Sequence, residues 1–210
     1  MRRLQVDPVT LDALREFGNI GAGHAATALS TLLGGRVKMS VTDARLCPFS
    51  EIVDVVGGGE TIVAAVFIRI FGTISGNMFV LMSLPSADRL LERLLERLLP
   101  APRKAQEYTE LEQSAIAEVG NILSGAYVAA ISDLCGISLN QSIPAVAIDM
   151  AAALLDIGLM MSGDEENQAI LISTSLVHDG NNIDAYFFLL PDLDGTEVLL
   201  DILRGKIRHG

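Results

Sequence analysis

The feature of this sequence that most constrains its fold is an internal repeat. Residues 11–41 align without gaps on residues 113–143, at a shift of 102 positions (118 minus 16). Identical pairs include Glu16/Glu118, Gly18/Gly120, Asn19/Asn121, Ile20/Ile122, Gly23/Gly125, Ala28/Ala130, Ser30/Ser132, Leu32/Leu134 and Gly34/Gly136. Further along the chain Pro85 corresponds to Pro191. Such a repeat predicts two similar units built from the same order of elements.

Hydrophobic periodicity and turn residues predict that order: a long helix, a short strand, an irregular or helical stretch, a β-hairpin and a closing helix. In the first half we expect helices at Pro8–Leu33 and Ser86–Leu99, and strands at Val37–Val41, Glu51–Val56, Thr61–Phe71 and Ser75–Leu84. In the second half we expect helices at Thr109–Leu134 and Asp192–Ile207, and strands at Ala169–Val177 and Ile183–Leu190. Thr109 and Glu112 have capping-box spacing, and Pro100–Lys104 is the expected linker.

These elements predict an α+β fold in which helices pack on an antiparallel-rich sheet. Residues 1–210 are expected to form a single domain of two internally duplicated halves, about 8–99 and 109–207, with pseudo-two-fold symmetry. Gly57-Gly58-Gly59 lies between two β-rich runs, and no Gly-Lys-Ser/Thr follows it. A hairpin turn therefore accounts for the three glycines better than a phosphate-binding loop does.

Charge and composition exclude several classes of function. The net charge of −11 argues against a nucleic-acid-binding protein, because phosphates require a basic surface. The longest apolar stretches, Ala145–Leu155 and Thr61–Phe71, are too short to span a bilayer, so we expect no membrane insertion and a cytoplasmic location. Cys47 and Cys135 are expected to be buried thiols rather than a disulfide. The histidines show no metal-ligand spacing, so we expect no metal site.

Projection at about 100° per residue separates each long helix into two faces. One face of each carries the repeated polar residues and a glycine: Asp12, Glu16, Asn19 and Gly23 in the first helix, and Ser114, Glu118, Asn121 and Gly125 in the second. The opposite, expected buried faces are Leu14, Phe17, Gly21, Ala25, Ala28 and Leu32, and Ile116, Val119, Leu123, Tyr127, Ala130 and Leu134. Gly18 and Gly120 lie beside these buried faces, where helix-to-helix packing explains them best.

The two polar faces have a structural and a functional explanation. A glutamate on an exposed helix face is ordinarily a solvated charge, and duplicated halves inherit similar helices. Asparagine costs roughly half a kcal/mol and glycine about 1 kcal/mol relative to alanine inside a helix. Keeping both residues twice, at the same spacing from a glutamate, favours an interaction or catalytic face.

These residues resemble a known family. The segments Glu16–Gly23 and Glu118–Gly125 are similar to the paired active-site helices of the CheC/CheX/FliY phosphatases of bacterial and archaeal chemotaxis. The resemblance covers essentially the whole chain, including the segment Ser142–Ala151. Within the family the chain resembles the CheC type, because CheX-type proteins carry one such site and FliY-type proteins add a C-terminal switch domain.

The resemblance implies an enzyme of two-component signalling that hydrolyses the aspartyl phosphate of a phosphorylated CheY-type response regulator. Asn19 and Asn121 would position the attacking water, and Glu16 and Glu118 would pair with the regulator's active-site lysine. Gly23 and Gly125, with Asp12 and Ser114, would contact the partner. No cofactor of its own is expected, and Mg²⁺ is expected on the regulator.

The resemblance also implies a second partner, the receptor deamidase CheD, and a chain that is monomeric when free. Asp149 is a candidate contact for CheD, and from the residues alone it is either on a helix surface or in an interface. The alternative to an enzyme is a non-catalytic adaptor or flagellar-switch-like module that binds the regulator or CheD.

Overall fold

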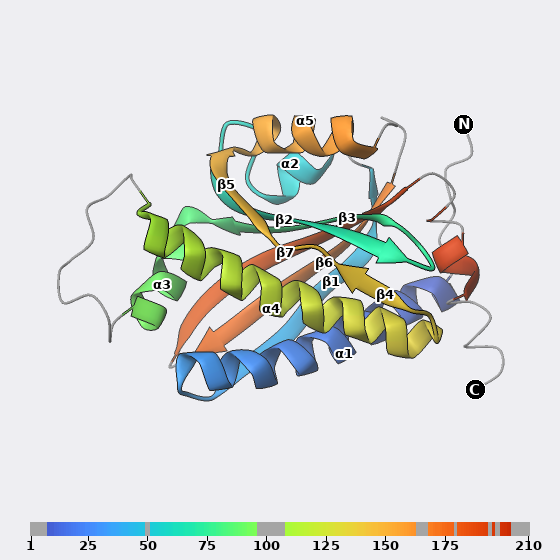
Figure 1. Cartoon of the computed structure of the whole chain (residues 1–210), viewed down its shortest axis with the longest axis horizontal. Helices are drawn as coiled ribbons and strands as arrows, with labels where there is room; N and C mark the ends of the chain where they lie inside the picture. The colour runs from blue at the N-terminus through green and yellow to red at the C-terminus, as the bar shows by residue number, and fades with distance from the viewer. Residues whose placement is uncertain are drawn as a thin grey trace.

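The computed structural model describes residues 8–48, 51–95, 108–162, 168–178, 180–192, 195 and 198–202. In chain order its elements are α1 (Pro8–Leu33), β1 (Val37–Pro48), α2 (Ile52–Val55), β2 (Ile62–Gly72), β3 (Gly76–Ser83), α3 (Leu84–Leu95), α4 (Glu110–Cys135), β4 (Leu139–Gln141), β5 (Ala145–Met150), α5 (Ala151–Ser162), β6 (Gln168–His178) and β7 (Asn181–Pro191). Helices cover both faces of one sheet, with α1 and α4 on one side and α2 and α5 on the other (Figure 1). The predicted α+β fold class is confirmed.

The described residues form a seven-stranded sheet in the order β1-β6-β7-β3-β2-β4, and β5 pairs with another part of β2. Every pairing is antiparallel. The outer strand β1 belongs to the first half of the chain but pairs with β6, and β5 of the second half pairs with β2. This is the order expected if two similar halves exchanged their outer strands. The duplication, its symmetry and the division of one domain into two repeats stay predictions.

Both long helices begin and end within one residue of the predicted positions. The Thr109 hydroxyl accepts a hydrogen bond from the Glu112 backbone N–H at 3.3 Å, and the Thr109 N–H donates to Glu112 Oε2 at 2.8 Å, which completes the capping box. At the other ends Gly34 has φ 68° and Gly136 has φ 65°. This left-handed conformation favours glycine and stops each helix.

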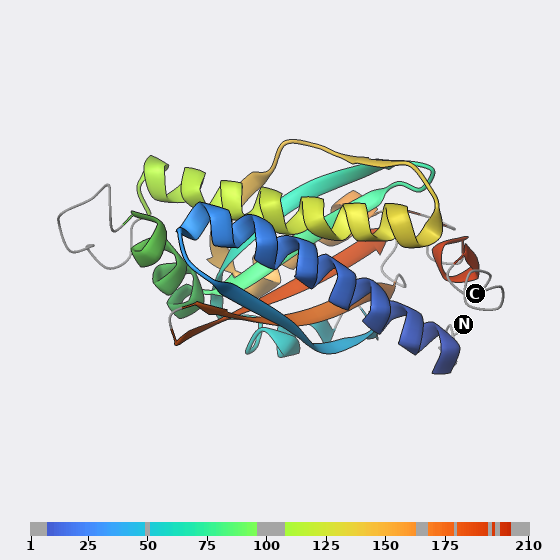
Figure 2. The same ribbon diagram turned by 90° about the horizontal axis from the view of Figure 1, so that it is seen from below.

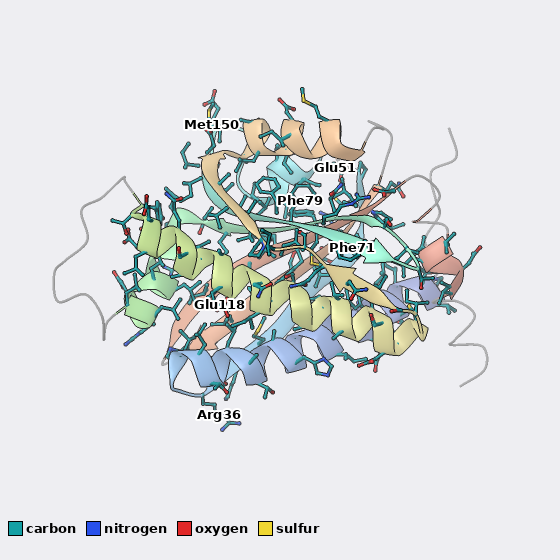
Figure 3. The ribbon with its side chains drawn as sticks, in the orientation of Figure 1. Arg36, Glu51, Phe71, Phe79, Glu118 and Met150 are labelled. Carbon is teal, nitrogen blue, oxygen red and sulfur yellow. The ribbon has the colours of Figure 1, made fainter. Side chains whose placement is uncertain are left out.

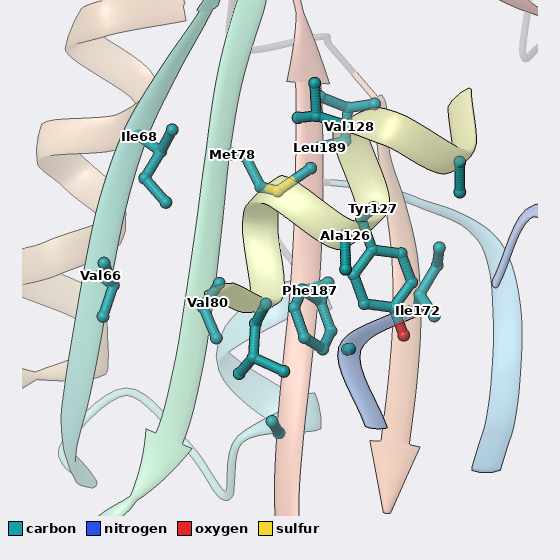
Figure 4. Close-up of a cluster of buried hydrophobic side chains, with 14 of the residues drawn as sticks. Val66, Ile68, Met78, Val80, Ala126, Tyr127, Val128, Ile172, Phe187 and Leu189 are labelled. Carbon is teal, nitrogen blue, oxygen red and sulfur yellow. The ribbon is translucent and has the colours of Figure 1, made fainter. Parts of the chain in front are cut away.

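Helices α1 and α4 lie side by side and antiparallel on the same face of the sheet (Figure 2). The Tyr127 side chain of α4 is fully buried between them and the strands. Its ring lies beside that of Phe187, at 4.3 Å between centroids (Figure 4). The centroid of the Phe17 ring on α1 is 5.6 Å away. The Tyr127 hydroxyl pairs with Thr174 Oγ1 at 2.9 Å, and burial raises the pKa of Tyr127 to about 12. This cluster holds the two long helices in place.

Glycines allow the helices to approach their neighbours closely. A Cβ on Gly21 would lie 2.4 Å from the Tyr127 ring, so Gly21 lets the two helices meet. A Cβ on Gly18 would lie 3.1 Å from Val41, and one on Gly120 would lie 2.6 Å from Val66. The expectation that Gly18 and Gly120 serve helix-to-helix packing is therefore wrong, because both glycines pack against strands.

The predicted buried faces are confirmed except near the helix ends. Ala28 and Leu32 are exposed, and Leu134 is half-buried. Leu29, Ile131 and Cys135, near the same helix ends, are fully buried, so the three residues lie beside the side of each helix that packs on the sheet. The two cysteines, Cys47 and Cys135, are buried thiols rather than a disulfide, as expected.

Several boundaries differ from the sequence-based expectation. Strand β1 runs to Pro48 rather than Val41, because β6 pairs with it along its whole length with a bulge between Val41 and Asp43. Residues 52–55 are helical instead of a strand, since Ile52 packs into the core under α5. Gly57 and Gly58, with φ 104° and 107°, therefore link a helix to β2 rather than two strands of a hairpin.

Two short strands and one helix, β4, β5 and α5, were not predicted as separate elements. The predicted helix at Ser86–Leu99 begins earlier, at Leu84, and is described as far as Leu95. Residues 198–202 are helical, within the predicted helix Asp192–Ile207. The predicted linker Pro100–Lys104 lies outside the described residues.

One helix among the described residues, α4, is long and apolar enough by length and composition to cross a membrane. Within its most apolar 18-residue window, 56% is buried inside the fold. The core helix of a soluble protein passes the same test, so this match is weak evidence for a membrane span.

Candidate functional site

The first predicted site is an exposed stripe along α1. The side chains of Asp12, Glu16 and Asn19 and the backbone at Gly23 are all exposed, while Phe17, Ala22 and Ala25 on the other side are buried. Positions three and four residues apart share a helix face, so the fold presents the four residues in one line. We call Asp12, Glu16, Asn19 and Gly23 the α1 stripe.

The second predicted site is the corresponding stripe on α4, made of Ser114, Glu118, Asn121 and Gly125. Ser114 and Glu118 are exposed, and Glu118 projects from α4 in Figure 3. Asn121 and Gly125 are half-buried, in contrast to their counterparts on α1. We call this set the α4 stripe. The structure thus brings together the members of each predicted stripe on one helix face.

The two glutamates carry free carboxylates. Within the described part of the chain neither Glu16 nor Glu118 forms an ion pair or accepts a hydrogen bond through its side chain. Asp12 has only a distant partner, Arg15, at 3.9 Å between exposed side chains, which is worth little in water. Both stripes therefore offer unpaired negative charge to a cationic partner.

The glycines of the stripes leave room above the helix. A Cβ added at Gly23 would meet nothing within 4 Å, and one added at Gly125 would meet only the Gln141 side chain, at 3.7 Å. No described residue packs closely enough against either position to require a glycine. An alanine at Gly23 would favour the helix by about 1 kcal/mol, so the glycine needs an explanation outside the fold.

The α4 stripe contains a contact that sequence reasoning missed. Gln141 Nε2 donates to Asn121 Oδ1 at 2.7 Å, from the end of the three-residue strand β4. The repeat aligns Gln141 with Met39 (141 minus 102), so the alignment gives no signal for it. Asn19, by contrast, forms no side-chain hydrogen bond with any described residue. The two stripes therefore differ in how their asparagine is held.

Asp149 lies apart from both stripes. It is exposed near the end of β5, where its Oδ1 accepts a hydrogen bond from the Met150 backbone N–H at 2.7 Å. Met150 projects outward beside the start of α5, on the opposite side of the sheet from α1 and α4 (Figure 3). The possibility that Asp149 lies on a helix surface is wrong, because its segment is an edge strand.

No group of three or more metal-ligating side chains occurs among the described residues.

Comparison with known proteins identifies the family. The CheC-like family model matches residues 9–41 and 111–156, which include both stripes and Asp149. The CheY-P phosphatase CheC of Bacillus subtilis (strain 168) is 37% identical over 201 residues, covering 94% of this chain and 95% of the relative. The chain belongs to the CheC-like family. A second CheC-like relative, the putative CheY-P phosphatase CheC1 of Halobacterium salinarum, is 24% identical and covers 90% of this chain and 93% of its own.

Solved structures share the CheC-like fold at lower identity. FliY of Thermotoga maritima superposes with a TM-score of 0.76 at 19% identity, covering 97% of this chain and 100% of the FliY chain. The FliM middle domain of Vibrio alginolyticus superposes with a TM-score of 0.65 at 15% identity, covering 90% of this chain and 99% of the FliM chain. At these identities the likeness shows the fold alone.

Proposed function

We propose that this chain is a phosphatase that hydrolyses the aspartyl phosphate of a phosphorylated CheY-type response regulator. The observation that carries the proposal is the Glu-x-x-Asn-x-x-x-Gly stripe, which both α1 and α4 carry with an exposed glutamate that has no ion pair among the described residues. It is supported by the 37% identity to a relative named for this activity. The proposal assigns one catalytic site to each stripe.

The chemistry requires little from the phosphatase. An acyl phosphate is reactive, and the regulator supplies Mg²⁺ and a lysine to balance the charge on the phosphoryl group. Hydrolysis then depends on a water held in line with the phosphorus, opposite the aspartate oxygen that leaves. A carboxamide both donates and accepts hydrogen bonds at neutral pH, so Asn19 and Asn121 are suited to orient this water. Neither asparagine forms a covalent intermediate.

The remaining stripe residues dock the regulator. The free carboxylates of Glu16 and Glu118 lie one helical turn before the asparagines, where each would pair with the regulator's lysine. Such a pair fixes the distance between the asparagine and the phosphoryl group. The acidic net charge of −11 favours this arrangement, because the cationic groups belong to the partner. Asp12 and Ser114 extend each contact surface by one further turn.

The open space above Gly23 gives a testable consequence. In a chain carrying Asn121→Ala, so that only the α1 stripe acts, Gly23→Ala is expected to raise the free energy of unfolding by about 1 kcal/mol and to lower the dephosphorylation rate. The new methyl group would meet none of the described residues of the chain, but it would lie where the regulator is proposed to approach. Thermal unfolding and phosphate release measure the two effects. His24→Ala, exposed but off the stripe, is the control, and an unchanged rate for Gly23→Ala would refute the partner contact.

The second proposed partner is CheD, which would bind at the exposed end of β5. Asp149→Lys is expected to abolish retention of CheD in a pull-down, because it reverses the charge of an exposed side chain on an edge strand. Asp156→Lys, a matched reversal on the exposed face of α5, should retain CheD. If Asp149→Lys still retains CheD, Asp149 is not part of the contact.

We further propose that the protein acts in the cytoplasm as a monomer when free.

The experiment that tests the function itself adds the purified chain to phosphorylated regulator and follows inorganic phosphate. A phosphatase releases phosphate faster than the regulator's own decay. An adaptor or switch-like module binds the regulator and leaves the decay unchanged or slower.

A further inference from the structure

The side chain of Gln141 reaches from β4 to the α4 stripe. Strand β4 pairs with the end of β2, where Gln141 lies opposite Ile70. From there Gln141 Nε2 approaches two oxygens of one residue: Asn121 Oδ1 at 2.7 Å and the Asn121 backbone oxygen at 3.4 Å. The same side chain lies beside Gly125, one turn later in α4. Gln141 therefore contacts the proposed water-positioning residue directly.

The backbone oxygen decides which way both amides face. A backbone carbonyl can only accept hydrogen bonds, so Gln141 must turn its NH₂ group toward Asn121. The 3.4 Å contact is long and contributes little energy, but a second carbonyl oxygen in its place would be repelled. With the NH₂ group of Gln141 turned inward, Asn121 must present Oδ1 to it and point Nδ2 away.

Packing alone does not explain a glutamine at this position. Gln141 Oε1 is buried and has no hydrogen-bond donor among the described residues of the chain. A buried acceptor without a protein partner is unfavourable, and an apolar residue would avoid it. The hydrogen bond to Asn121 is the contact that the amide makes and a leucine could not.

We propose that Gln141 is a positioning residue that presets the Asn121 amide for hydrolysis at the α4 stripe, an inference that rests on the proposed phosphatase function. The terminal torsion of an asparagine is broad and roughly two-fold, so a free amide spends time in unproductive orientations. The bond from Gln141 occupies one lone pair of Oδ1. It leaves the second lone pair and both Nδ2 hydrogens for the water and the phosphoryl oxygens.

The α1 stripe has no hydrogen bond of this kind to its asparagine among the described residues. The Asn19 side chain is exposed and has no hydrogen-bond partner among the described residues. Met39 stands at the position aligned with Gln141, and its thioether side chain carries no N–H to donate. The effect of Gln141 should therefore be confined to one stripe. That restriction separates a positioning role from a general contribution to stability.

The test measures steady-state kinetics on phosphorylated regulator in two parent chains. Asn19→Ala leaves the α4 stripe active, and Asn121→Ala leaves the α1 stripe active. Gln141→Leu removes the donor, while Gln141→Glu keeps the size of the side chain but presents only acceptors when ionised. Both changes are expected to lower kcat about tenfold in the Asn19→Ala parent, with KM unchanged. Neither is expected to change the rate of the Asn121→Ala parent, and Asn140→Ala, the neighbouring amide on β4, should change neither parent.

Each other outcome has a defined meaning. Equal losses in both parents, or a raised KM with constant kcat, would assign Gln141 a structural or binding role and overturn the inference. The inference would also be overturned if the Gln141 substitutions left kcat unchanged in the Asn19→Ala parent. It would be overturned as well if the Asn19→Ala parent were inactive while the Asn121→Ala parent was active. If neither parent, nor the unmodified chain, exceeds the regulator's own decay, the proposed phosphatase function itself fails.

Discussion

The chain carrying both Asn19→Ala and Asn121→Ala is expected to dephosphorylate the regulator at a rate lowered roughly 10²-fold or more. Removing one positioned polar group from a catalytic site typically slows catalysis by this factor. Each single substitution is expected to leave partial activity, because the other stripe still carries its asparagine. The measurement is the initial rate of phosphate loss from phosphorylated regulator, after subtraction of the regulator's own decay. Neither side chain packs in the core, so both substitutions should leave the fold intact.

A matched control distinguishes the stripes from helix surface in general. Thr31 and Asp133 are exposed residues at aligned positions of α1 and α4, away from the faces that carry the stripes. A Thr31→Ala/Asp133→Ala chain is expected to dephosphorylate the regulator at the unmodified rate. A double-asparagine variant that also kept that rate would remove both asparagines from the mechanism.

Tyr127→Ala is expected to lower the free energy of unfolding by roughly 3–5 kcal/mol, which is a large part of the 5–15 kcal/mol typical of a folded domain. The substitution empties a fully buried site between α1, α4 and the sheet. It removes the ring contacts with Phe17 and Phe187 and leaves the Thr174 hydroxyl without its partner. Gly21 cannot fill the space, because it contributes no side chain. Denaturant unfolding measures the loss.

Two further substitutions are expected to lower the free energy of unfolding by less than Tyr127→Ala does. Tyr127→Phe keeps the ring and loses only the hydrogen bond to Thr174, so we expect a cost of about 1 kcal/mol. Phe71→Ala truncates an aromatic ring that is 45% exposed at the end of β2, and we expect a smaller loss than for Tyr127→Ala. Equal stabilities for Tyr127→Ala and the unmodified chain would show that this cluster does not hold the helices together.

The parts of the fold that follow from local interactions could be predicted from the sequence. The capping box of Thr109 and Glu112, the glycine ends of both long helices and the hairpins β2–β3 and β6–β7 depend on residues close in the chain. The same holds for the stripes, since helical spacing alone places Glu16 and Asn19 on one exposed face.

The parts that depend on distant partners could not be predicted. Residues 42–48 form a strand only because β6, far along the chain, pairs with them. The β-branched residues of 52–55 favour a strand by propensity, but the packing of Ile52 beneath α5 makes this segment a helix. Gln141 was missed for the same reason. Its contact with Asn121 joins a short strand to a helix. The residue aligned with Gln141 in the first half is Met39, so the repeat does not reveal the contact.

The difference between the two stripes changes how the repeat is understood. At the level of sequence Glu16, Asn19 and Gly23 match Glu118, Asn121 and Gly125 letter for letter. In the structure Asn19 is exposed, whereas Asn121 is half-buried and hydrogen-bonded to Gln141. Identical motifs therefore occupy different surroundings, and equal activity of the two proposed sites does not follow from identical residues.

The most direct test of the central claim is phosphate release from phosphorylated regulator with this chain present at a small molar fraction of the regulator. A phosphatase turns over many regulator molecules, so we predict that the initial rate rises in proportion to the amount of chain and that phosphate released exceeds the number of chains present. A rate equal to the regulator's own decay at every amount of chain would contradict the account.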